Sequence, residues 1–245
     1  MKSITIAICT LGLVLNLNSC KDTDPNPQPN PDPNALKVLT LGDSRVEGAR
    51  PEYESYRFEL WKNFVQADWA VDFLGRRRDA GDYPQEAGLS FDPDHQGTGG
   101  EVSAGLLNTL RDYEAPLDVE VALVGIGGND LLDGGESVTS VLDNISQIVT
   151  ELRRLNSGVV ILVEQIAPIR SDLMVDGLPE TLTEFHSGIA ELVSNLSTMA
   201  SPVIAIDMAP GWSDSLLADE VHYNTAGAKL VADRYFAAIE ANLPR

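Results

Sequence analysis

Three residues have the chemical types that nucleophilic catalysis requires: Ser44 in the stretch GDS, and Asp219 and His222 in the stretch DEVH. A serine hydroxyl becomes a nucleophile when a histidine accepts its proton and a carboxylate holds that histidine in the correct tautomer. The spacing of three residues allows Asp219 to reach the ring nitrogen of His222 that faces away from the serine. The alternative is structural: Ser44 would cap a helix, and His222 would be a polar residue before the last helix.

Two glycine-containing stretches are further candidates for contact with a substrate or ligand. The stretch FDPDHQGTGGEVSAG, residues 91–105, places Gly97, Gly99 and Gly100 within four positions, so that the backbone can approach a substrate with its amides exposed. Taken alone, this clustering favours no more than a flexible loop. The second stretch, GIGGND, ends in Asn129 and Asp130 and begins like a dinucleotide-binding fingerprint, but Asp130 stands where the last glycine belongs.

Several other chemistries are disfavoured by the sequence. No serine lies in the pattern G-x-S-x-G of α/β-hydrolases, and no Gly-Lys-Ser/Thr of a phosphate loop occurs. Two cysteines and three scattered histidines offer no zinc-ligand spacing. Asp92, Asp94 and His95 could hold a cation, although a solvated loop is the simpler interpretation. The motifs therefore favour neither a zinc site nor a phosphate loop.

The elements that must position these residues follow from hydrophobic periodicity. Segment 138–155 has apolar residues at steps of three and four, Tyr56, Leu60 and Phe64 form a shorter stripe, and a last helix is expected from Asn224 or Thr225. Residues 103–112 could form another helix. Strands are predicted where branched residues gather, at 38–41, 71–74, 119–125, 159–166 and 203–207.

Strands that alternate with helices predict one three-layer α/β/α domain over residues 36–245, with a five-stranded parallel sheet. In such a sheet, ligands bind at the carboxyl ends of the strands. Ser44, Asn129, Asp219 and His222 all follow predicted strands. We therefore expect these residues to meet at one edge of the sheet.

Four ordered blocks resemble the SGNH/GDSL hydrolase superfamily, and the resemblance runs from about residue 38 to 236. The blocks are GDS at 42–44, the glycine-rich stretch at 97–105, GGND at 127–130 and D-x-x-H at 219–222. The resemblance implies a flavodoxin-like sandwich without metal or cofactor. It also implies roles: Ser44 as nucleophile, His222 as base and Asp219 as the orienting acid, with an oxyanion hole made by Ser44, Gly100 and Asn129. Gly100 is preferred to Gly97 because GTGGEVSAG resembles the family's glycine-rich block, in which the second glycine supplies the backbone amide.

The sequence departs from the family pattern beside the serine. Arg45 follows Ser44 where an aliphatic residue is usual, and it could start a helix, pair with Asp43 or Glu47, or touch the substrate. Gly99 and Glu101 also replace the more usual serine and aromatic residue.

The expected substrate is a small acyl ester, since residues 55–75 and 92–97 resemble carbohydrate acetylesterases of the acetyl-xylan type. The activity implied is removal of acetyl groups from carbohydrate hydroxyls. A lipase, lysophospholipase or acyl-thioesterase of the same superfamily is the first alternative. A surface protein that binds glycans without turnover is the second.

The first twenty residues differ from the rest. A short basic start, an apolar run over 4–17 and the stretch LNSC resemble a bacterial lipoprotein signal over residues 1–19, with Cys20 as the lipidated residue. A retained membrane anchor is the alternative. Residues 20–35 contain five alternating prolines, typical of an extended tether. We therefore expect an exported, lipid-anchored protein in the periplasm or at the cell surface.

The net charge of −20 limits the possible partners. An anionic domain repels phosphate backbones at long range, so nucleic acid is not an expected partner. A neutral carbohydrate ester fits this charge, and contact with a membrane is expected through the lipid anchor only. With Cys9 inside the signal, no disulfide framework is expected.

Overall fold

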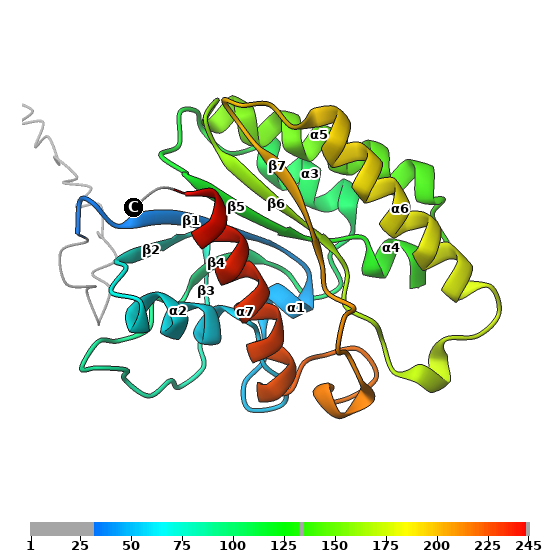
Figure 1. The fold of residues 1–245 in the computed structure, drawn as a ribbon, viewed down its shortest axis with the longest axis horizontal. Helices are drawn as coiled ribbons and strands as arrows, with labels where there is room; N and C mark the ends of the chain where they lie inside the picture. Colours follow the sequence, from blue (N-terminus) through cyan, green and yellow to red (C-terminus); the bar gives the residue numbers. More distant parts are fainter. Residues whose placement is uncertain (1–31, 133–134, 244–245) are drawn as a thin grey trace, which may run out of the picture. The chain divides into compact units, whose positions relative to one another are not determined.

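Seven strands form one sheet in the computed structural model, which describes residues 32–132 and 135–243 (Figure 1). The order is β3-β4-β1-β5-β6-β7, and β2 pairs with the first half of β1. All pairs are parallel except β3 with β4. The strands are β1 (Leu36–Gly42), β2 (Val71–Leu74), β3 (Arg77–Arg78), β4 (Asp94–Gly97), β5 (Val121–Gly125), β6 (Val160–Gln165) and β7 (Val203–Asp207).

The predicted α/β class is confirmed, but the prediction of five strands was wrong. The five apolar runs form β1, β2, β5, β6 and β7, whose order β2-β1-β5-β6-β7 is that of flavodoxin-like sheets. Two strands were missed, β3 and β4, and β4 has the sequence DHQG, which carries no apolar pattern. It is held by pairing with Leu41 and Gly42, and its buried polar groups find partners: the Gly97 amide donates to His95 Nδ1, and the Tyr113 hydroxyl donates to Gln96.

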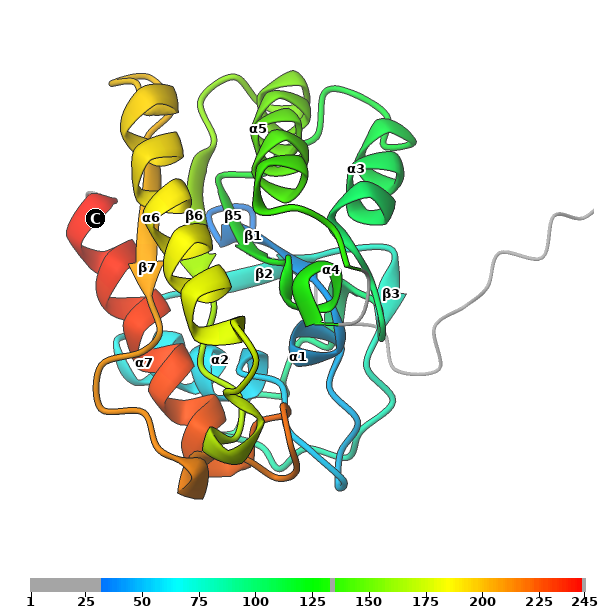
Figure 2. The ribbon, with the colours of Figure 1, turned by 90° about the vertical axis from the view of Figure 1, so that its right-hand side faces the viewer.

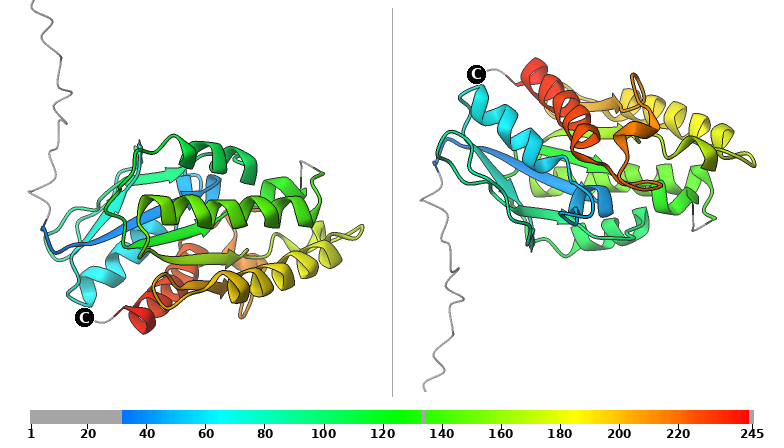
Figure 3. Two further views of the ribbon diagram at one scale, coloured as in Figure 1. Left: turned by 90° about the horizontal axis from the view of Figure 1, so that it is seen from above. Right: turned by 90° about the horizontal axis from the view of Figure 1, so that it is seen from below.

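Helices cover both faces of the sheet (Figures 2 and 3). On one face α2 (Arg57–Gln66) packs beside α7 (Thr225–Asn242), and on the other lie α3 (Ser103–Arg111), α5 (Val138–Leu155) and α6 (Leu178–Leu196). Each face of the sheet therefore has its own hydrophobic core. Four short helices lie in the connections: α1 (Ser44–Glu47), α4 (Gly128–Leu132), η1 (Ser171–Leu173) and η2 (Asp214–Leu216).

The predicted helices formed because their apolar stripes meet the sheet. The α5 stripe is buried, and Ser137 caps its first turn by accepting a hydrogen bond from the Ser140 amide. The α7 helix begins at Thr225, and the Asn224 side chain accepts from the amides of Ala226 and Gly227. The helix expected over residues 103–112 forms α3.

The N-terminal predictions fall on residues outside the described part of the chain. This applies to the signal over residues 1–19, to Cys20 and to most of the proline-containing tether, all of which stay predictions. Within residues 32–132 and 135–243, no helix combines the length and apolarity needed to cross a bilayer.

Candidate active site

Ser44 is the first residue of α1, immediately after β1. Gly42, at the end of β1, lies so close to β5 that a Cβ there would come within 2.0 Å of the Gly125 carbonyl oxygen. Only glycine allows the chain to turn at this point. Asp43 caps α1, because its Oδ1 accepts a hydrogen bond of 2.9 Å from the Arg45 amide. The cap is therefore Asp43 and not Ser44, which leaves the serine hydroxyl available for other contacts.

The structure brings Ser44, His222 and Asp219 together in a chain of hydrogen bonds. The Ser44 Oγ lies 2.9 Å from His222 Nε2, and His222 Nδ1 lies 2.7 Å from Asp219 Oδ2. The other carboxylate oxygen of Asp219 accepts from the backbone amides of Val221 and His222. Partial burial acts to raise the pKa of Asp219, but these amide hydrogen bonds and the His222 ring outweigh burial and lower it. Asp219 is thus held as an anion facing the imidazole.

Tyr53 also contacts the imidazole, a contact that the sequence did not indicate. Its ring stacks on the His222 ring with centroids 3.9 Å apart and an angle of 16° between the planes. Tyr53 lies between α1 and α2, in a segment held by its own bridge to Ala49. The stacking fixes the plane of the imidazole, which the two hydrogen bonds alone would leave free to tilt.

Gly100 and Asn129 lie next to each other in space. The Asn129 Nδ2 donates a hydrogen bond of 2.8 Å to the carbonyl of Glu101, the residue after Gly100. Gly100 occupies a turn closed by the Glu101 amide on the Thr98 carbonyl, and its φ of +73° favours glycine. Because an amide group has two N–H donors, Asn129 retains one. Among the described residues, none accepts a hydrogen bond from the backbone amides of Ser44 or Gly100.

Asp130 connects the Gly100 turn to the helix that carries Asn129, a role that its position in the sequence did not indicate. Both of its carboxylate oxygens accept from the Ser103 amide, at 3.0 and 2.9 Å, and one also accepts from the Ser103 hydroxyl at 2.6 Å. Asp130 is buried, and Ser103 begins α3. The carboxylate therefore joins the start of α3, and the turn before it, to α4. No spacing rule relates residues 27 positions apart, so only the fold exposes this contact.

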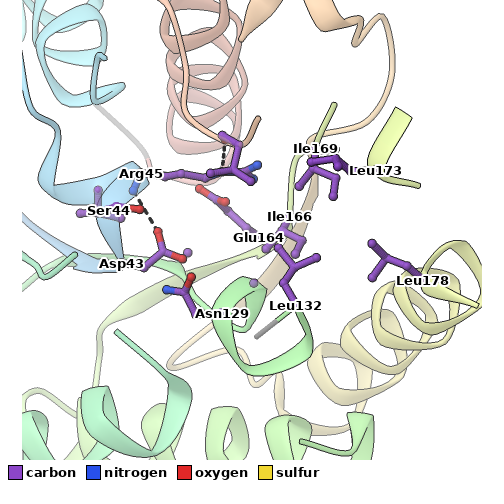
Figure 4. Close-up of a pocket in the computed structure, with 14 residues that line it drawn as sticks. Asp43, Ser44, Arg45, Asn129, Leu132, Glu164, Ile166, Ile169, Leu173 and Leu178 are labelled. Atoms are coloured by element: carbon purple, nitrogen blue, oxygen red, sulfur yellow. Dashed lines mark hydrogen bonds between the residues drawn. The ribbon is translucent and has the colours of Figure 1, made fainter. Parts of the chain in front are cut away.

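A cavity of about 340 Å³ opens beside Ser44 (Figure 4). Ser44, Arg45, Asn129 and Glu164 lie toward one end of it. Aliphatic side chains from α4, η1, α6 and the segment after β6 form the other wall: Leu132, Ile166, Ile169, Leu173 and Leu178. The site therefore combines a polar reacting end with an apolar wall.

Glu164 is a buried carboxyl at this cavity that the sequence did not single out. A Cβ on Gly125 would come within 2.9 Å of the Glu164 carboxyl group, so glycine at the end of β5 leaves the space that Glu164 fills. Burial raises the pKa of Glu164 to about 7, opposed by a hydrogen bond of 2.6 Å from the Tyr235 hydroxyl and by the charge of Arg45. Burial likewise raises the pKa of Asp43, with Arg45 acting in the opposite direction.

The residues considered for a cation are engaged within the protein. Asp92 accepts from the amides of Phe73 and Asp94, and His95 is 2% exposed. The expectation of a solvated loop here was wrong, because this segment leads into β4 and packs against β1 and β2. Over residues 32–132 and 135–243, no group of three or more His, Cys, Asp or Glu side chains could hold a metal ion.

A family model, that of the GDSL-like lipase/acylhydrolase family, matches residues 40–230, from β1 into α7. The chain belongs to this family. The match includes every residue of the Ser44, His222 and Asp219 hydrogen-bond chain, together with Gly100 and Asn129. No curated protein matches the chain.

Solved structures of esterases share the fold. A carbohydrate esterase family 3 protein from Talaromyces cellulolyticus aligns with a TM-score of 0.73 and 25% identity, over 84% of this chain and 97% of that one. An acetyl esterase mutant with an acetate ion aligns with a TM-score of 0.73 and 24% identity, with the same coverage. A Clostridium thermocellum family 3 carbohydrate esterase aligns at 0.67 and 22%, covering 85% and 97%. The family and the 25% identical carbohydrate esterase support an esterase.

Proposed function

We propose that the protein is a serine esterase that removes small acyl groups, above all acetyl, from carbohydrate hydroxyls. The observation that carries this proposal is the Ser44–His222–Asp219 chain, with distances of 2.9 and 2.7 Å between successive heavy atoms. Both distances are within hydrogen-bonding range, as proton transfer from serine to imidazole requires.

The reaction begins when Ser44 Oγ attacks the ester carbonyl carbon and His222 Nε2 accepts the hydroxyl proton. Asp219 keeps a proton on Nδ1, so that Nε2 is the basic nitrogen, and it stabilises the imidazolium that forms. Collapse of the tetrahedral intermediate breaks the bond to the alcohol, which receives its proton from His222. Water then repeats the sequence on the acylated Ser44 and releases the carboxylic acid.

Negative charge on the carbonyl oxygen would be met by three donors: the amides of Ser44 and Gly100 and the second N–H of Asn129. The absence of a described acceptor for the two backbone amides supports this role. Each such donor contributes about 3–4 kcal/mol to lowering the barrier. Since the donors belong to three separate elements, the oxyanion hole depends on the contacts that hold those elements together.

We infer that the alcohol part of the ester is a carbohydrate. The support is the 25% identical carbohydrate esterase family 3 protein, which aligns over nearly its whole length. The negative charge of the chain is compatible with a neutral glycan. The aliphatic wall of the cavity favours a second candidate, an esterase or thioesterase for longer acyl chains, because an acetyl group would leave Leu178 and Leu173 without contact.

An acyl-chain series separates the two candidates. We would measure acetate release from acetylated xylan and acetylated monosaccharides, and kcat/KM for p-nitrophenyl acetate, butyrate and octanoate. The proposal expects the highest kcat/KM for acetyl esters and acetate release from the carbohydrates. A preference for octanoate that is lost in Ile169→Trp, a change that fills the apolar end of the cavity, would refute the acetylesterase and support the second candidate. Ser44→Ala provides the background rate.

A further inference from the structure

The short helix α1 carries two charged side chains that reach in different directions from Ser44. Arg45 donates from Nε to the Val221 carbonyl at 2.9 Å and from Nη1 to the Ala167 carbonyl at 2.8 Å. Its guanidinium also lies over the Tyr223 ring, 5.0 Å from the centroid. Arg45 thus contacts residues before and after His222, and it connects them to the segment that follows β6.

These contacts suit a guanidinium and no other side chain. A planar fork can donate to two carbonyl groups in fixed directions and still stack on an aromatic face, whereas an ammonium group is a single point of charge. Hydrogen bonds from a charged donor are about twice as strong as neutral ones. The loop that carries His222 is only half-buried, so the orientation of its backbone depends on such contacts.

Glu47, two residues further along α1, contacts the turn that carries Gly100. Its Oε2 accepts a hydrogen bond of 2.6 Å from the Gly99 amide, and its Oε1 accepts one of 2.6 Å from Arg77 on β3. The helix and β4 are in close contact here, since a Cβ on Gly97 would come within 2.4 Å of the Glu47 nitrogen. The carboxylate therefore fixes the peptide group between Thr98 and Gly99, in the turn that contains Gly100.

We propose that Arg45 and Glu47 are positioning residues. Arg45 fixes the position of the His222 loop relative to Ser44, and Glu47 fixes the position of the Gly100 turn relative to Ser44. This proposal rests on the proposed esterase function. The nucleophile, the base and the backbone donor are then all located by one helix of four residues. The Arg45 side chain, for which the sequence allowed pairing with Asp43 or Glu47, instead donates to backbone carbonyls.

Arg45 also lines the cavity, so a contact with substrate is the competing role. The two roles differ in kinetics. Loss of a positioning group lowers kcat, because small displacements of reacting groups cost about 100-fold. Loss of a uniform substrate contact raises KM and leaves kcat unchanged.

The first experiment measures kcat and KM for p-nitrophenyl acetate with Arg45→Ala, Arg45→Lys and the control Arg111→Ala, an exposed arginine on α3. We expect kcat to fall about 100-fold in Arg45→Ala with KM changed less than about 2-fold. Arg45→Lys keeps a positive charge if the alanine variant does not fold, and we expect it to lose kcat too. Millimolar guanidinium, but not ammonium, should restore part of the Arg45→Ala activity. A raised KM at unchanged kcat, or wild-type kinetics, would overturn the role of Arg45.

The second experiment compares Glu47→Ala with Glu151→Ala, whose carboxylate contacts Arg154 at the same 2.6 Å. We expect only Glu47→Ala to lower kcat and to weaken inhibition by a phenylboronic acid, which forms a tetrahedral anion on the serine. Equal effects in the two variants would overturn the role of Glu47. Wild-type protein that neither hydrolyses esters nor reacts with a fluorophosphonate would refute the proposed function and this proposal together. An active wild type with unaffected variants would refute the positioning proposal alone.

Discussion

At the scale of single residues, the contacts around Ser44 decide between a helix cap and a nucleophile. Asp43 performs the capping, and the Ser44 hydroxyl instead faces His222. The neighbouring residues then follow from chemistry: a base needs a carboxylate to orient it, and an oxyanion needs donors that nothing else occupies. Asn129 meets the second need with an amide that has only one of its two hydrogens engaged by Glu101.

We expect Asn129→Ala to lower kcat for acetyl esters by about 100- to 1,000-fold with little change in KM, because the lost hydrogen bond acts in the transition state. Steady-state kinetics on p-nitrophenyl acetate measure this, with Asn63→Ala as the matched control, because Asn63 is a half-buried side chain on α2 whose Nδ2 donates to Asp233. A rise in KM at constant kcat would instead assign Asn129 to substrate binding.

The stacked ring of Tyr53 leads to a second residue-scale expectation. Tyr53→Phe keeps the aromatic face against His222 and should retain kcat within about 2-fold, whereas Tyr53→Ala should lose kcat several-fold because the imidazole is no longer held in plane. Equal activity of the three proteins would show that the two hydrogen bonds of His222 suffice. Thermal unfolding of each variant checks that the difference is not one of stability.

At the scale of elements, apolar patterns predicted the strands and helices that form the hydrophobic core, and few of the other elements. The runs that became β5 and β6 are continuous and buried, and the α5 stripe faces the sheet. The polar strand β4 has no such pattern, because its position depends on pairing with the last two residues of β1. The same holds for Glu47 on Gly99 and for Asp130 on Ser103. These contacts join segments distant in sequence, and no local spacing encodes them.

Glu164 on β6, which accepts a hydrogen bond from Tyr235 on α7, leads to an expectation about pH. Its folded-state pKa is about 7 against an ordinary value of 4.5, so the folded protein binds this proton more tightly than the unfolded chain. The contribution to stability is complete below about pH 4.5 and is lost as the pH rises to about 7. Glu164→Gln stays neutral and can still accept from Tyr235. We therefore expect its unfolding free energy, relative to wild type, to increase from pH 5 to pH 8.

Urea denaturation at both pH values measures this difference, with exposed Glu191→Gln on α6 as the control. The control should give the same difference from wild type at pH 5 and pH 8. A Glu164→Gln difference that is constant or that shrinks with rising pH would mean that Glu164 is charged in the folded protein over this whole range.

At the scale of the whole molecule, the sequence predicted the fold class and a meeting of four side chains at one edge of the sheet. In the described structure this edge holds Ser44, Asn129, Asp219 and His222. The reason is topological: in a parallel sheet with right-handed crossovers, all carboxyl ends meet on one side. Strand number and the contacts of Arg45 could not be predicted, because both depend on how connections outside the apolar runs fold back.

The N-terminal segment leads to a whole-molecule expectation. We propose that Cys20 is lipidated and that the alternating prolines after it hold the esterase domain away from a membrane. Expressed with its full N-terminus in a bacterial host, the wild-type protein should sediment with membranes, and Cys20→Ser should not. Metabolic labelling with palmitate should mark only the wild type. Sedimentation of both proteins would contradict lipidation and favour a retained apolar anchor.

The most direct test of the active site is covalent labelling of the folded protein with a fluorophosphonate, followed by mass spectrometry of its peptides. We expect a single modified residue, Ser44, with labelling lost in Ser44→Ala and slowed at least about 100-fold in His222→Ala, since the base must remove the hydroxyl proton. No labelling of the wild type, or equal labelling of wild type and Ser44→Ala, would contradict the central claim that residue 44 is an activated nucleophile.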